Sequence, residues 1–95
     1  MNELKTEEDV RELIEDNEYE DVVIFSNPDY ASAFIGISED GRAVYDYEKM
    51  IDYLMNKENW SDNETVEFIE YNTIRALPYM GEKSPIIVYP LAYVE

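Results

Sequence analysis

The chain of 95 residues contains no cysteine and no histidine. Without cysteine it cannot form disulfides, use a thiolate nucleophile or bind metals through thiolates. Without histidine it lacks the common zinc sites and the catalysis that depends on imidazole. Carboxylate pairs or carboxylate-bound magnesium remain as enzymatic options, but so small a domain has little room for a substrate pocket. We therefore expect a protein that is not an enzyme and takes no cofactor.

Glycine is scarce, and long apolar runs are missing. Gly36, Gly41 and Gly81 stand alone, at spacings that do not form a glycine-rich phosphate loop. The oxygen-rich stretch at residues 59–64 lacks the glycine that a calcium loop needs at its sixth position. No stretch approaches the roughly 20 apolar residues of a membrane span, and residues 1–16 lack the apolar run of a signal peptide. These features predict a cytoplasmic protein without membrane contact.

Basic residues are few: seven Lys and Arg stand against 23 Asp and Glu, which gives a formal charge of −16. A field of this sign attracts cations and basic proteins and repels nucleic acid and anionic membranes. Solubility alone needs a charge magnitude of only about 2 to 8 in a small domain. The charge therefore predicts a basic protein partner, with nucleic-acid-binding proteins as the favoured class, and no direct binding of nucleic acid.

Apolar residues are plentiful and periodic despite this charge. Hydrophobic residues make up 45% of the chain, and nine are tyrosines. This content is enough for one modest core, so residues 1–95 are expected to fold as a single domain.

Helix signals appear in three places. Thr6 precedes acidic first-turn residues and an apolar i, i+3, i+4 pattern, which predicts a helix over about residues 7–17. Asp46 can cap a second helix that runs to about Lys57. Ser61 and Glu64 form a capping box ahead of a third helix, which we expect to end at Pro78. Its inward residues are expected to be Val66, Ile69, Thr73 and Leu77.

Strand signals appear in four places. Residues 22–25 form a short apolar run that predicts a mostly buried strand. Residues 33–38 and 42–45 flank Asp40-Gly41, which predicts a hairpin with a two-residue loop and Ile37 opposite Val44. Residues 86–89 form the last strand, and Pro90 indicates a sheet edge. The result is an α+β domain with a mainly antiparallel four-stranded sheet, three helices and the element order α-β-β-β-α-α-β.

The acidic residues of the first helix are the candidate binding surface. Glu8, Glu12 and Glu15 lie on one stripe, and Asp16 and Glu18 extend it. Carboxylates four residues apart are separated by about 6 Å of helix rise, and DNA phosphates by about 3.4 Å per strand. Such a stripe can imitate nucleic acid on a basic protein and inhibit it by competition. The alternative is a solvated helix face that serves solubility.

The many tyrosines support a second hypothesis for the function of the protein. Phe34 and Tyr45 are expected to share one face of the hairpin and to cover Gly36. If no helix covers that face, the patch predicts a homodimer through Tyr45. The protein would then be a homo-oligomeric accessory or regulatory module whose acidity only keeps it soluble. Arg75, late in the third helix, is expected to have a structural role.

Residues 22–55, and especially residues 67–79 with the sequence EFIEYNTIRALPY, carry a resemblance. The chain resembles a family of small, acidic, uncharacterised bacterial proteins that also occurs in phage and mobile-element contexts. This resemblance implies an intracellular setting and an accessory or anti-defence role. It supplies no catalytic or binding residues.

Overall fold

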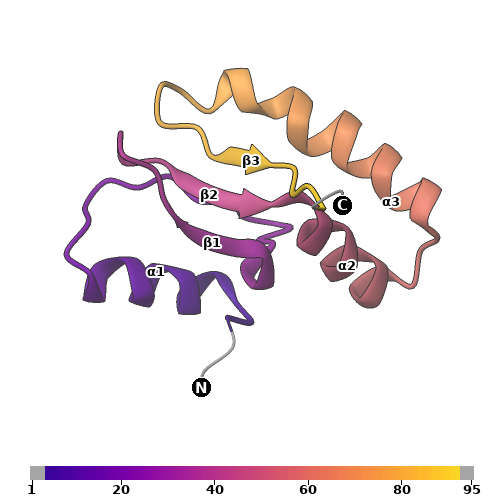
Figure 1. Cartoon of the computed structure of the whole chain (residues 1–95), viewed down its shortest axis with the longest axis horizontal. Coiled ribbons are helices and arrows are strands. Elements are labelled where there is room, and N and C mark those ends of the chain that lie inside the picture. The colour runs from indigo at the N-terminus through magenta and orange to yellow at the C-terminus, as the bar shows by residue number, and fades with distance from the viewer. Residues whose placement is uncertain (1–3, 93–95) are drawn as a thin grey trace.

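The computed structural model describes residues 4–92. Helix α1 (Glu7–Asp16) is followed by a buried irregular segment, a 3-10 turn η1 (Ala31–Ala33) and the hairpin β1 (Phe34–Ile37) and β2 (Ala43–Asp46). Helices α2 (Tyr47–Glu58) and α3 (Asp62–Phe68) come next, and α3 continues through a π turn η2 (Ile69–Thr73) and a 3-10 segment η3 (Ile74–Tyr79). Strand β3 (Ile86–Val88) completes the fold (Figure 1).

The sheet has three strands in the order β1-β2-β3. Strands β1 and β2 are antiparallel, whereas β2 and β3 are parallel, because α2 and α3 form the crossover between them. The predicted four-stranded, mainly antiparallel sheet is therefore wrong. Residues 22–25 are buried or half-buried but form no strand. An apolar run indicates burial, and it does not by itself indicate a partner strand.

The hairpin differs from the predicted register. Its loop has three residues, because the Ser38 N–H donates to the Arg42 carbonyl at 2.8 Å and Gly41 takes a left-handed φ of +84°. Ile37 consequently lies opposite Ala43 rather than Val44. A bulge between Phe34 and Gly36 then brings Phe34 opposite Tyr45. Phe34 and Tyr45 do share a face, with their ring centroids 5.6 Å apart.

The three predicted helix starts are confirmed. Thr6 and Ser61 each form a complete capping box, and the Asp46 side chain accepts the Lys49 N–H at 3.1 Å. The interior of the third helix differs from the prediction. Val66 is exposed, and Thr65 is buried instead, with its hydroxyl donating to the Ser61 carbonyl. The chain also stays helical through Pro78, to Tyr79.

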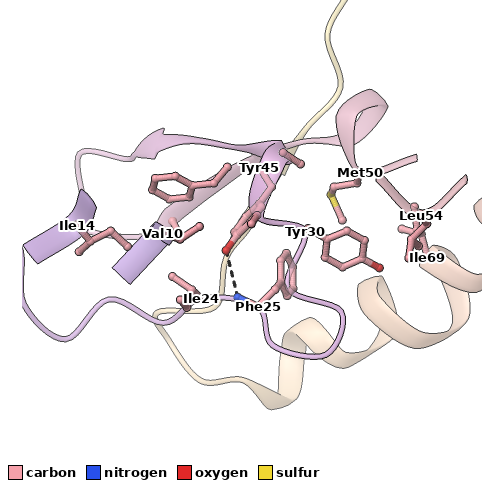
Figure 2. Packing of buried hydrophobic residues seen from close by; sticks show 13 residues of the cluster. Val10, Ile14, Ile24, Phe25, Tyr30, Tyr45, Met50, Leu54 and Ile69 are labelled. Atoms are coloured by element: carbon pink, nitrogen blue, oxygen red, sulfur yellow. Dashed lines mark hydrogen bonds between the residues drawn. The ribbon is translucent and has the colours of Figure 1, made fainter. Parts of the chain in front are cut away.

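The core joins one face of the sheet to the helices. Val10 and Ile14 of α1, Met50 and Leu54 of α2, and Ile69 of η2 are buried in one cluster (Figure 2). Aromatic rings fill its centre, where Phe25 lies 5.4 Å from Tyr30 and 4.6 Å from Tyr45 between ring centroids. The opposite side of α1 is left to solvent, and it carries the acidic stripe.

Candidate functional site

The acidic stripe lies on one regular helix. Glu8, Glu12, Glu15 and Asp16 are exposed, and the buried residues of α1 are Val10 and Ile14 on its inner side. An α-helix rises 1.5 Å per residue, so Glu8 and Glu12 are separated by about 6 Å along the axis. The structure therefore places four of the predicted site residues together on the surface of one helix, and Glu18 follows directly after its end.

The C-terminal end of α1 is negative for two reasons, the helix dipole and the acidic side chains of its last turn. A helix carries a partial negative charge at its C-terminus, which favours Lys, Arg or His in the last turn. The last turn of α1 contains no basic residue and ends with Glu15 and Asp16. Each acidic side chain at such an end costs about 0.3 to 1 kcal/mol at low ionic strength. Helix stability does not explain these carboxylates.

Glu18 occupies a position that usually belongs to glycine. The Tyr19 N–H donates to the Ile14 carbonyl at 3.2 Å, and the Glu18 N–H donates to the Glu15 carbonyl at 2.9 Å. These two bonds define a Schellman motif, whose residue after the C-cap takes a left-handed conformation. Glu18 has φ +64°, which costs a residue with a Cβ about 1 kcal/mol relative to glycine. The chain thus carries a carboxylate where local stability favours glycine.

One cation lies close to this end of α1, because Arg11 stands one helical turn before Glu15. No lysine or arginine occurs between Arg11 and Arg42. Within residues 4–92, ion pairs join Arg11 to Glu7 at 3.0 Å and Arg42 to Asp40 at 3.8 Å, and neither involves the predicted site residues. Glu8, Glu12, Glu15, Asp16 and Glu18, here called the α1 acidic surface, are therefore exposed and take part in no ion pair within residues 4–92.

No family model, curated protein or solved structure matches the chain. The described part of the chain contains no cluster of three or more Asp or Glu side chains placed to hold a metal ion. None of the helices within residues 4–92 is long and apolar enough to cross a membrane.

Tyr45 lies in the core rather than on the surface. Its relative exposure is 0%, and its hydroxyl accepts the Phe25 N–H at 3.2 Å (Figure 2). Phe34 is also buried, because the segment through Phe25 and helix α1 cover this face of the sheet. Tyr45 cannot contact a partner in this structure, and the condition for a homodimer through the Phe34/Tyr45 patch is not met. The hairpin register predicted from the sequence does not indicate which segments cover the Phe34/Tyr45 face of the sheet.

The groove between α1 and β1 was not predicted from the sequence. It has a volume of about 240 Å³ and is lined by α1 and the residues after it on one side and by β1 on the other. Leu13 and Tyr19 contribute exposed apolar surface, with relative exposures of 41% and 47%. The signal in the sequence is Leu13, which belongs with Val10 and Ile14 to the apolar i, i+3, i+4 pattern that predicts this helix. Of the three, only Val10 and Ile14 are buried.

Asp29 also has a role that was not predicted from the sequence. Its carboxylate accepts the Glu7 N–H at 3.0 Å, the Ala31 N–H at 3.0 Å and the Tyr53 hydroxyl at 2.8 Å. Burial and the hydrogen bond to this carboxylate raise the pKa of Tyr53 to about 12. Asp29 therefore connects the positive end of α1 to α2 and fixes the direction in which α1 presents its acidic side.

Arg75 lies over the ring of Tyr71, with 4.6 Å between its guanidinium carbon and the ring centroid. This cation–π contact is within one helical segment and is consistent with a structural role. It lies outside the α1 acidic surface.

Proposed function

We propose that this protein is a non-enzymatic interaction protein whose α1 acidic surface binds a basic, nucleic-acid-binding protein. It would occupy the site that the partner uses for nucleic acid and so act as an inhibitor by mimicry. The chain resembles a family of small, acidic, uncharacterised bacterial proteins that also occurs in phage and mobile-element contexts, and this resemblance favours a cytoplasmic, accessory or anti-defence setting for such an inhibitor.

The observation that carries the proposal is the left-handed Glu18 at the negative end of α1. Glu15, Asp16 and Glu18 all stand where the backbone or the helix dipole disfavours a carboxylate. A charge needed only for solubility could be placed anywhere on the surface. Residues that lower stability at one place on a fold are characteristic of functional surfaces.

A pull-down from nuclease-treated host lysate tests the proposal, with bound proteins identified by mass spectrometry at low and high salt. We expect one nucleic-acid-binding protein to be retained at low salt and lost at high salt, because exposed charges are screened. The purified partner should then be displaced from a fluorescent oligonucleotide by this protein. Retention that is indifferent to salt, or a partner that still binds its oligonucleotide, would contradict mimicry.

A matched pair of charge variants identifies the surface. The test variant replaces Glu8, Glu12 and Glu15 with Gln, and the control replaces Glu67, Glu70 and Glu82 with Gln. All six side chains are exposed, so both variants change the net charge equally without touching the core. Loss of binding in the test variant with retention in the control would assign the site to α1. Equal loss in both would show that total charge, not this surface, determines binding.

The alternative function is a homo-oligomeric module, and it makes the opposite prediction. Self-association through apolar surface should be nearly indifferent to salt and to either set of Gln substitutions. Sedimentation of the purified protein at low and high salt distinguishes the two.

A further inference from the structure

The groove between α1 and β1 has the size of a site for one or two side chains. Its walls include Leu13, Tyr19, Phe34 and Ile37, and its volume is about 240 Å³. Pockets that enclose a small molecule usually measure about 300 to 1,000 Å³. Gly36 also lines the groove, and a Cβ at this position would meet no atom within 4 Å, so the space beside Gly36 is open. These dimensions suit one or two aliphatic side chains of a larger partner.

The negative charge around the groove favours basic side chains from a partner. Glu12 precedes Leu13, and Glu18 and Glu20 flank Tyr19, and these carboxylates are exposed. Both walls come from the stretch between Arg11 and Arg42, which contains no lysine or arginine. Lysine and arginine have long aliphatic stems that pack on apolar surface while their charged ends reach outward. A basic segment can therefore cover Leu13 and Tyr19 and meet the surrounding carboxylates at the same time.

The outer edge of β1 indicates the conformation of that segment. Among residues 4–92, β1 pairs with β2 and with no other strand, so its other edge, on the side of α1, has no strand partner (Figure 1). The sequence of β1, Phe-Ile-Gly-Ile, has no charge or proline of the kind that protects edge strands from further pairing. The bulge at Ile35 limits regular pairing to the Gly36–Ile37 end of the strand. A short extended segment fits there.

From these observations we propose that the α1/β1 groove binds an extended, lysine- and arginine-rich segment of the partner. The segment lies along Gly36 and Ile37, its aliphatic stems pack on Leu13 and Tyr19, and its charges face the α1 acidic surface. This inference rests on the proposed function, since it specifies how the basic partner is held.

Fluorescence anisotropy with two labelled peptides of equal charge tests the inference. One peptide alternates lysine with valine, and the other alternates lysine with serine. We expect the lysine–valine peptide to bind about tenfold more tightly, because valine can enter the groove and serine gains little there. In the NMR spectrum of the full chain, the amide signals of Gly36, Ile37 and Tyr19 should shift on titration with this peptide.

Variants of exposed groove residues provide a second test of the groove inference. Leu13→Ser and Tyr19→Ser should each weaken the lysine–valine peptide about fivefold, with little effect on the lysine–serine peptide. Tyr79→Ser is the control, since Tyr79 is 90% exposed and lies in η3, outside the groove lining. The amide shifts of the unmodified protein keep the test independent of how the variants fold.

The outcomes separate the inference from the proposed function. Equal affinity for the two peptides, or amide shifts confined to α1, would overturn the groove inference. If both peptides still bound at low salt and needed Glu8, Glu12 and Glu15, the acidic surface would remain supported. If neither peptide bound at low salt, both proposals would fail.

Discussion

The Tyr45 hydroxyl accepts a hydrogen bond from the Phe25 backbone N–H at 3.2 Å inside the core. Phe25 belongs to a buried segment that forms no strand, so this N–H has no sheet partner. A side chain of β2 thus supplies the acceptor that a neighbouring strand would otherwise provide. This bond satisfies the buried Phe25 N–H without a neighbouring strand, and it gives the hydroxyl of the fully buried Tyr45 a partner.

Replacement of Tyr45 with Phe should destabilise the protein by about 1 to 3 kcal/mol, because the Phe25 N–H would be left buried without an acceptor. Chemical denaturation with urea measures the free energy of unfolding. Tyr79→Phe is the control, and we expect it to have almost no effect, since Tyr79 is exposed. A neutral effect of Tyr45→Phe would contradict the hydrogen bond.

Stability should fall in the alkaline range. Burial raises the pKa of Tyr30 and of Tyr45 from 10.0 to about 12, although Tyr30 also shares a hydrogen bond of 2.6 Å with the Thr73 hydroxyl. The folded state therefore retains protons that the unfolded state releases above pH 10, and unfolding becomes easier as the pH rises from about 10 to about 12. Urea denaturation at a series of pH values measures this slope.

Tyr30→Phe removes one of the titrating hydroxyls and should flatten that slope, at the cost of the hydrogen bond to Thr73. A slope equal to that of the unmodified protein would show that Tyr30 does not contribute. Tyr71→Phe serves as the control, because Tyr71 is exposed.

Replacement of Glu18 with Gly should stabilise the protein by about 1 kcal/mol, because glycine takes a left-handed φ without steric cost and the helix end loses a carboxylate. The melting temperature measures the gain. The same substitution should weaken binding to the basic partner and reduce its salt dependence. A variant that is more stable and binds equally well would remove Glu18 from the interface.

Replacement of Asp29 should loosen α1 from the rest of the fold. Asp29→Ala loses all three hydrogen bonds, to the Glu7 N–H, the Ala31 N–H and the Tyr53 hydroxyl, and should cost about 3 kcal/mol. Asp29→Asn keeps one acceptor oxygen and should cost about 1 kcal/mol. Hydrogen exchange should speed up first in α1. Uniform acceleration across the chain would contradict a local role for Asp29.

The starts of the helices and the total charge could be read from the sequence. Thr6, Asp46 and Ser61 cap helices through hydrogen bonds to residues three positions later, so everything needed lies within one turn of chain. The acidic stripe on α1 follows from the same local periodicity. The net charge depends on composition alone.

The tertiary structure decided what each apolar surface meets. Residues 22–25 and β3 have similar apolar sequences, yet the first forms no strand and the second pairs in parallel with β2. The burial of Tyr45 and the α1/β1 groove likewise depend on contacts between distant segments. The hydrogen bonds of a helix cap involve residues only a few positions apart, so the local sequence determines them. Strand pairing and side-chain burial depend on which distant segments pack together when the whole chain folds.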